Sequence, residues 1–140
     1  PFISLRLFNV YGPNYDLKSQ YAGVIGKFFS KFLKNKNIEI YGNGKQTRSF
    51  IHVNDIVKAF ILAGLSKKKF EIYNVGASKS ISINKLASFF PLQVKYKKKR
   101  EGEVDKSSTS IKKIKKDLNF NPEINLEDGI KNYIDNYERK

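Results

Sequence analysis

Two arginines in polar, glycine-rich surroundings are the residues of this chain best suited to bind phosphate. Arg48 follows the turn at residues 42–44 and opens a predicted strand, Arg100 lies in a later basic loop, and nearly all other cations are lysines. The planar guanidinium group binds phosphate oxygens in a bidentate manner, whereas a lysine acts as a point charge. A rigid strand–turn–strand corner that fixes one guanidinium group therefore predicts a phosphate site.

Composition leaves little material for metal or acid–base chemistry. The 140 residues contain no cysteine and a single histidine, His52, so we predict no metal site. Tyr41 and Lys45 have the spacing of a Tyr-x-x-x-Lys dyad, but the Gly-Asn-Gly between them predicts a turn, and only a helix would place both side chains on one face. We therefore predict no catalytic residue in this chain, and we expect His52 to be packed and hydrogen-bonded.

The charge of the chain is strongly positive, with 27 Lys and Arg against 13 Asp and Glu and a formal net charge of +14. Such a charge alone suggests a nucleic acid or another anionic surface as a partner. The lysines are, however, spread along predicted helices and loops, and we expect the aromatic residues on apolar helix faces rather than between the lysine clusters. We therefore predict no nucleic-acid partner, and a small basic nucleic-acid-binding module stays open as an alternative from another functional class.

Hydropathy and the first residue bear on where the protein works. No apolar run approaches the ~20 residues that a membrane-spanning helix needs, and no signal-peptide pattern is present. We therefore expect a cytoplasmic protein with no membrane partner. The sequence begins with Pro1 and contains no methionine, which leads us to expect that it is part of a longer protein.

Strands alternate with helices along the predicted chain, which indicates the α/β class. Short apolar runs predict strands at residues 2–8, 38–41, 47–53, 70–75 and 93–97. Apolar residues at helical spacing predict five helices, at residues 19–35, 55–65, 83–90, 110–118 and 126–138. We expect helix caps at Asn54 or Asp55, at Ser82 and at Asn125, and a loop at residues 101–108.

The first predicted strand, residues 2–8, is apolar on both faces, which is typical of a parallel sheet covered on both sides. Such a strand needs neighbours on both edges and helices above and below it, and this chain supplies few candidates for them. We therefore expect residues 1–12 to be the last part of a sheet that begins elsewhere. Residues 13–140 would complete a single domain.

Several segments together resemble the C-terminal half of the NAD-dependent epimerase/dehydratase family, the extended short-chain dehydrogenases. The segments are LRLFNVYGP at 5–13, IYGNG at 40–44, TRSFIHVND at 47–55, YNVG at 73–76, REGE at 100–103 and LEDGI at 126–130. They occur in the family's order from end to end of the chain. Within the family, QYAGVI at 20–25 is most similar to UDP-glucose 4-epimerases.

The resemblance implies a site for a nucleotide-diphosphate sugar, and it assigns roles to particular positions. Asn9 would contact the nucleotide sugar, and Ile40 and Tyr41 would cradle the base. Arg48 and Arg100 would grip the diphosphate from two sides. Residues 13–140 would then be the nucleotide-sugar-binding region.

The resemblance also implies that NAD is the cofactor, with Leu7, Phe8 and Val10 lining its nicotinamide face. The family's Gly-x-x-Gly-x-x-Gly turn, which binds the dinucleotide, and its Tyr-x-x-x-Lys dyad are absent from this chain. We therefore expect that the N-terminal NAD-binding half is missing and that the chain alone is inactive. The parent protein would be a homodimeric, NAD-dependent isomerase or lyase acting on nucleotide sugars.

The resemblance leaves the reaction open. A UDP-glucose 4-epimerase is the main expectation. A dTDP-glucose 4,6-dehydratase and a UDP-glucuronate decarboxylase or epimerase are the alternatives within the family, because the residues that decide between these reactions lie mostly upstream. A decayed gene product without activity is a further possibility.

Overall fold

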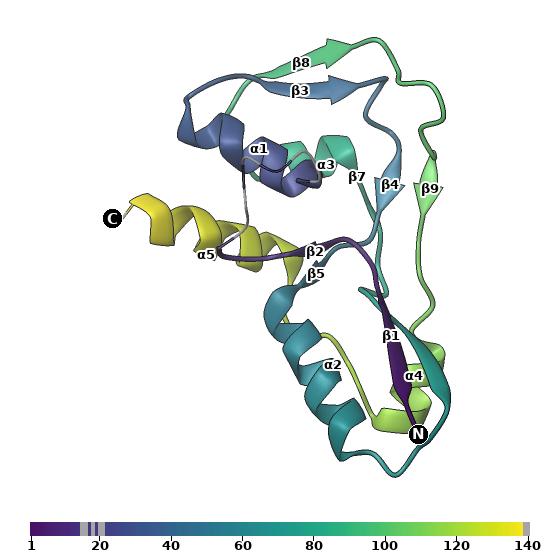
Figure 1. Cartoon of the computed structure of the whole chain (residues 1–140). Coiled ribbons are helices and arrows are strands. Elements are labelled where there is room, and N and C mark those ends of the chain that lie inside the picture. Colours follow the sequence, from purple (N-terminus) through teal and green to yellow (C-terminus); the bar gives the residue numbers. More distant parts are fainter. Residues whose placement is uncertain (15–16, 18, 20–21, 139–140) are drawn as a thin grey trace.

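The chain folds as an α/β protein with helices packed on short, mostly parallel strands (Figure 1). The structure, a computed structural model, describes residues 1–14, 17, 19 and 22–138. Within these residues there are five helices: α1 (Val24–Leu33), α2 (Val53–Leu65), α3 (Ile83–Ala87), α4 (Lys112–Leu118) and α5 (Leu126–Glu138). The α/β class and the five helices expected from the sequence are thus confirmed. None of these helices has the length and apolar character that crossing a membrane requires.

The strands in the described part of the chain form four small sheets. Three are parallel pairs: β1 (Ile3–Leu7) with β6 (Glu71–Val75), β2 (Val10–Tyr11) with β5 (Ile51–His52), and β3 (Ile38–Tyr41) with β8 (Val94–Lys97). In the fourth, β4 (Thr47–Arg48) lies between β7 (Ile81–Ser82), which is antiparallel to it, and β9 (Lys106–Ser107), which is parallel. The short central strand β4 is therefore held on both edges.

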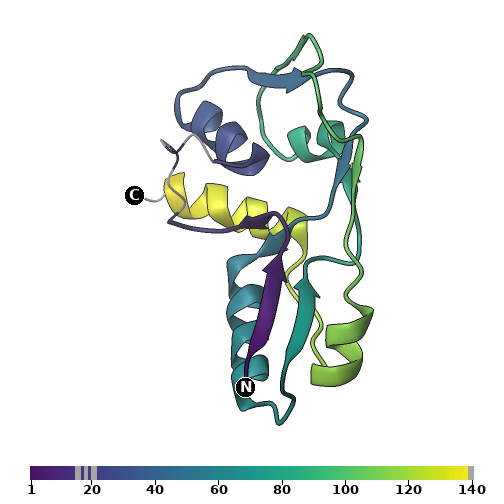
Figure 2. The ribbon, with the colours of Figure 1, turned by 45° about the vertical axis from the view of Figure 1, so that its right-hand side comes forward.

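Two hydrophobic cores hold these elements together. The first lies between α1, α3, α5 and the β3–β8 pair, and it includes Phe29, whose ring stacks on Tyr133 with 4.0 Å between ring centroids. The second lies under α2, α4 and the β1–β6 pair, and Tyr73 and Ile114 are fully buried in it. Figures 1 and 2 show the two groups of elements at opposite ends of the molecule, with α5 between them.

The first strand forms where it is expected, but this chain does not cover it on both sides. Within the described residues β1 pairs with β6 alone. Phe2 is 58% exposed and Leu7 is 43% exposed. The prediction that the sheet continues beyond this chain stays a prediction.

The predicted strand at 47–53 is wrong, because the chain changes sheets in the middle of it. β4 belongs to the sheet with β7 and β9, whereas β5 pairs with β2. Between them, the backbone oxygen of Ser49 accepts a hydrogen bond from Asn9 Nδ2 at 2.9 Å instead of taking part in a strand ladder. The predicted loop at 101–108 likewise contains β9, because Lys106 and Ser107 pair with β4.

Some helix boundaries also differ from the expected ones. α1 begins at Val24 rather than at residue 19, and residues 20 and 21 of the predicted helix lie outside the described residues. The regular part of α3 ends at Ala87, and the chain continues in single turns toward Pro91, with Phe90 N donating to Ala87 O at 3.1 Å. The caps at Ser82 and Asn125 are confirmed, since both side chains accept backbone N–H groups of their helices.

The start of α2 differs from the expectation that Asn54 or Asp55 caps it. His52 is the cap, because its Nδ1 accepts a hydrogen bond from Asn54 N at 3.2 Å. Asp55 lies inside the first turn and is 3% exposed. Its two oxygens accept the backbone N–H groups of Glu123 at 3.0 Å and Ile124 at 3.2 Å. Asp55 therefore ties α2 to the segment before α5, which joins the two cores.

We predict that Asp55→Ala lowers the free energy of unfolding by about 3 kcal/mol, because it leaves two backbone N–H groups without their charged acceptor. Urea denaturation followed by circular dichroism measures this loss. Asp55→Asn keeps one acceptor oxygen and should lose less than the alanine variant. Equal stability of Asp55→Ala and the unmodified chain would contradict this role of Asp55.

The cap at His52 predicts a pH dependence of stability. Burial lowers the pKa of His52 from its ordinary 6.5, and this outweighs the opposing effect of the Asp55 carboxylate. The neutral ring is therefore favoured in the folded state, so its contribution is present above pH 6.5 and is lost as the pH falls through the lower folded-state value.

We therefore expect the free energy of unfolding to fall between about pH 7.5 and about pH 5 in the unmodified chain. His52→Asn keeps an acceptor at the cap but does not titrate, and it should show a smaller fall over the same range. Denaturation curves at several pH values test this, and parallel pH profiles for the two proteins would refute it.

Candidate functional site

The residues predicted to bind a nucleotide sugar meet in one place. A cavity of about 210 Å³ is lined by side chains from α1, β3, β4 and the segment after β8, and among its lining residues are Asn9, Ile40, Tyr41, Arg48 and Arg100. Arg48 and Arg100 also share an adjoining open hollow of about 390 Å³. The two guanidinium groups, distant in the sequence, thus face common concavities. That these residues bind a ligand stays a prediction.

Arg48 is held by a strand of only two residues. It is the second residue of β4, which is paired with β7 on one edge and β9 on the other. Its Nη1 donates a hydrogen bond to Thr47 O at 2.8 Å. The strand pairing and this bond restrict where the guanidinium group lies, so little ordering is needed when it meets an anion.

Arg100 reaches the same place from residues 98–105, which we call the Arg100 loop. Its guanidinium group lies over the ring of Tyr41, with Cζ 3.7 Å from the ring centroid. Such cation–π contacts are favourable, so this contact helps to hold the Arg100 side chain against β3. Lys99, next to Arg100, forms an ion pair with Asp105 at the end of the loop, with 2.6 Å between Lys99 Nζ and Asp105 Oδ1.

The turn between β3 and β4 fixes the corner that carries Tyr41 and Arg48. Gly42 and Gly44 have φ angles of +74° and +70°, a region that favours glycine. A Cβ atom on Gly44 would lie 1.8 Å from Asn84 Oδ1. Asn84 Nδ2 in turn donates to Asn43 O at 3.0 Å. The turn therefore packs tightly on α3 and cannot take a larger residue, and it is not the helix that a Tyr-x-x-x-Lys dyad would need.

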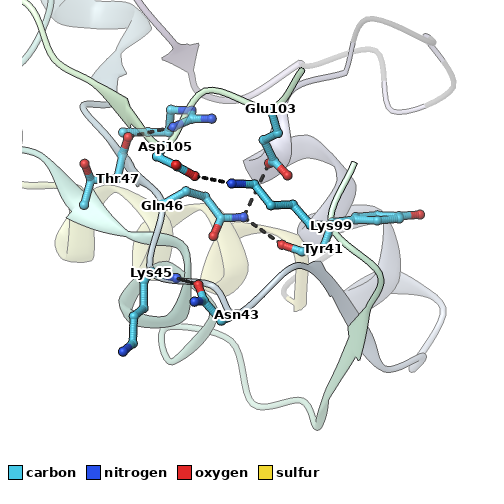
Figure 3. Close-up of polar contacts among 9 residues, drawn as sticks. Tyr41, Asn43, Lys45, Gln46, Thr47, Lys99, Glu103 and Asp105 are labelled. Carbon is cyan, nitrogen blue, oxygen red and sulfur yellow. Dashed lines mark hydrogen bonds and ion pairs between the residues drawn. The ribbon is translucent and has the colours of Figure 1, made fainter. Parts of the chain in front are cut away.

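Two further residues shape the cavity, and the sequence argument did not assign them a role. Gln46 is 9% exposed, and its Nε2 donates to Tyr41 O at 2.8 Å and to Glu103 Oε1 at 3.4 Å (Figure 3). The other carboxylate oxygen of Glu103 is buried without a hydrogen-bond partner among the described residues. Glu103 is the last residue of the REGE segment, so the sequence could have indicated its place in the site. Gln46 belongs to no such segment, and nothing in the sequence indicated its role.

Comparison with known proteins places the first half of the chain in one enzyme family. The model of the NAD dependent epimerase/dehydratase family matches residues 1–76. The chain belongs to this family.

Relatives and solved structures in the family cover nearly all of the chain. A putative UDP-glucose 4-epimerase of Methanocaldococcus jannaschii is 42% identical over 93% of this chain and 43% of that protein. A UDP-N-acetyl-α-D-glucosaminuronate decarboxylase of Bacillus cytotoxicus is 33% identical over 96% of this chain and 45% of that protein. The crystal structure of the Thermotoga maritima UDP-glucose 4-epimerase with UDP-glucose matches with a TM-score of 0.88 at 30% identity, over 98% of this chain and 46% of that one. The chain thus spans less than half the length of the curated relatives it matches.

The residues that the family resemblance assigns to NAD lie apart from the cavity. Leu7, Phe8 and Val10 do not line it, although their neighbour Asn9 does. Phe8 N donates to Val75 O at 3.0 Å, and Val10 packs on the second core. Asn9 has a φ of +45°, in the left-handed region, so the extended backbone is interrupted between β1 and β2.

The charges around the cavity suit an anion. Three cations, Lys27, Arg48 and Arg100, and two carboxylates, Glu39 and Glu103, line it. Ile40 contributes little free side-chain surface, because it is 1% exposed and packs in the first core. No group of three or more potential metal ligands is found in the described part of the chain.

The pKa of Asp105, beside this site, is lowered chiefly by its hydrogen bond from Lys99 and to a smaller degree by Arg48. The exposed carboxylate is therefore ionised at neutral pH, and its pairing with Lys99 joins two positions within the Arg100 loop. Thr47 N also donates to the backbone oxygen of Asp105 at 2.8 Å. The loop is thus attached to β4 on the side next to Arg48.

One expectation about the basic surface is wrong. Tyr96 is 59% exposed on β8 between Lys95 and Lys97, so one aromatic ring does lie within a lysine cluster. It sits there because β8 (Val94–Lys97) is a strand whose outer side is uncovered, not a helix face. Its hydroxyl donates to Asn84 Oδ1 at 3.3 Å, so the ring belongs to the same contacts that hold the Gly44 turn.

Proposed function

We propose that this chain forms the nucleotide-sugar-binding part of an NAD-dependent epimerase or dehydratase, most similar to the UDP-glucose 4-epimerases. The observation that carries the proposal is the single cavity that Arg48, Arg100 and Tyr41 share at the corner between β3 and β4. The likeness in fold to an enzyme that holds UDP-glucose supports it.

In the proposed complex the two guanidinium groups bind the diphosphate. A nucleotide-sugar diphosphate carries about two negative charges, and charge-assisted hydrogen bonds to it contribute roughly 1.5–3 kcal/mol each. Tyr41 would contact the base, and Asn9 would contact the sugar. The buried free oxygen of Glu103 would accept a hydrogen bond from a hydroxyl group of the ligand, which satisfies an acceptor that is otherwise costly to bury.

NAD would supply the redox chemistry, by taking a hydride from the sugar and returning it. The side chains of this chain that are assigned to its nicotinamide are apolar, and Leu7 is 43% exposed, which fits contact with one face of an aromatic ring. The remaining contacts of NAD and the Tyr-x-x-x-Lys dyad would come from outside this chain. The role of the described residues is therefore to bind and orient the sugar nucleotide.

The sister reactions of the family stay as alternatives within this proposal. A decarboxylase is 33% identical to the chain, and the cavity described above binds the nucleotide part of a substrate rather than the reacting carbon. A homodimeric parent protein in the cytoplasm completes the proposal. The basic nucleic-acid-binding module is less favoured, because the exposed rings that the structure describes beside lysine clusters already have partners. The hydroxyl of Tyr96 donates to Asn84, and the ring of Phe70 packs edge-on against Phe2.

We predict that Arg48→Ala weakens the binding of UDP-glucose by at least about tenfold, because one of the two diphosphate-binding groups is lost. Isothermal titration calorimetry with the full chain measures the dissociation constant. Thermal unfolding of the same variant shows whether the fold is kept.

The matched control is Arg6→Ala. It removes the same charge from an exposed position on β1 that lines none of the cavities described above. Its affinity for UDP-glucose should stay within about twofold of the unmodified chain. An Arg48→Ala variant that is folded and binds UDP-glucose as tightly as the unmodified chain would remove the basis of the proposal.

A further inference from the structure

The side chain of Gln46 stands at the junction between the cavity and the Arg100 loop. It lines the 210 Å³ cavity on one side and a neighbouring hollow of about 500 Å³ on the other. Its amide nitrogen binds the backbone oxygen of Tyr41 and a carboxylate oxygen of Glu103. In Figure 3 the amide lies between these two partners, which come from β3 and from the Arg100 loop.

We propose that Gln46 is a positioning residue for the diphosphate site, and that its amide holds the Arg100 loop against the end of β3. The inference rests on the proposed function, since it says how the second guanidinium group of that site is kept in place. Gln46 itself need not touch the ligand. It would act through Glu103, three residues after Arg100, and through Tyr41, on whose ring Arg100 stacks.

The chemistry of the amide group explains why a glutamine suits this place. Both partners are acceptors, a carbonyl and a carboxylate, and the NH₂ group of a glutamine offers two donors. A glutamate of the same shape would offer none when ionised and would place a second negative charge beside Glu103. Gln46 is also nearly buried at 9% exposure, so water cannot readily replace a lost bond.

Other contacts hold the two ends of the Arg100 loop but not Glu103. At its start, Gly42 N donates to Lys97 O at 2.9 Å. The Lys99–Asp105 ion pair and the bond from Thr47 N fix Asp105. Neither involves Glu103 or the ring of Tyr41. Without the amide of Gln46, Glu103 would lose its hydrogen bond to the segment between β3 and β4. Arg100 would then be held by its contact with the Tyr41 ring and by the two ends of the loop.

The test uses a variant in which two carboxylates repel each other at high pH and share a proton at low pH. Gln46→Glu places two carboxylates side by side, and such a pair binds one proton at a raised pKa. Charged groups from each neighbouring element face the site: Lys27 from α1, Glu39 from β3, Lys45 from the turn, Arg48 from β4, and Lys99, Arg100, Glu103, Asp105 and Lys106 from the Arg100 loop and β9. The nearby cations oppose the rise in the pKa of this carboxylate pair. The affinity is therefore measured over the whole pH range rather than at two values.

We expect Gln46→Glu to bind UDP-glucose about tenfold more weakly than the unmodified chain at about pH 8, and to recover to within about threefold at about pH 5.5, when the pair shares a proton. UDP-glucose is the probe because its diphosphate does not titrate in this range. Calorimetric dissociation constants at several pH values, with the full chain, give the profile.

Two controls separate positioning from a general structural effect. Gln46→Ala should bind weakly at every pH, because it has nothing to protonate. Gln93→Glu makes the same chemical change at an exposed position outside the cavities and should follow the unmodified chain throughout. If Gln46→Glu does not fold, Gln46→Ala carries the test alone, and an unchanged affinity of that variant overturns the inference.

The outcomes also distinguish this inference from the proposed function. If the unmodified chain fails to bind UDP-glucose, the proposed function fails and the role of Gln46 falls with it. If the unmodified chain binds UDP-glucose and Gln46→Glu binds it equally well at both ends of the pH range, the inference alone is wrong. A loss that does not recover at low pH, in a folded Gln46→Glu, also counts against it.

Discussion

Two guanidinium groups face the same small cavity, although the segments that carry them lie about fifty residues apart in the sequence. The surrounding elements are arranged so that both groups are held there. Like charges repel, so Arg48 and Arg100 must each be held by other contacts. Arg48 is placed by strand pairing, and Arg100 by stacking on Tyr41. Each arginine is therefore held in place while guanidinium N–H groups remain available to bind an anion.

The fold supplies a rigid corner for this purpose. The Gly44 turn packs on Asn84, β4 is held on both edges, and β3 is anchored in the first core through Ile38 and Ile40. The Arg100 loop connects β8 to β9 and therefore links the sheet that carries Tyr41 with the sheet that carries Arg48. A change in that loop would alter both walls of the cavity together.

The features that the sequence predicted well are those decided by neighbours along the chain. Helical spacing located the five helices, and local side-chain chemistry located the caps at Ser82 and Asn125. Both arginines stand out by residue type and by their polar, glycine-rich surroundings, and the resemblance to a family then assigns them to the diphosphate. These features require little knowledge of the tertiary structure.

The features that the sequence missed depend on contacts between distant segments. The break between β4 and β5 follows from pairing with three other strands, which no local pattern records. Asp55 looks like a helix cap in the sequence, and only the approach of residues 123 and 124 reveals its partners. Gln46 has no distinguishing neighbours, and its importance rests on Glu103, which is 57 residues away.

The most direct test of the account compares two ligands that differ only by the diphosphate and its sugar. Binding of UDP-glucose and of uridine is measured for the unmodified chain, Arg48→Ala and Arg100→Ala. The account predicts that each variant loses affinity for UDP-glucose and keeps its affinity for uridine, because both guanidinium groups act on the diphosphate. If either variant keeps its affinity for UDP-glucose, or loses affinity for uridine to the same extent, the two arginines do not share one diphosphate.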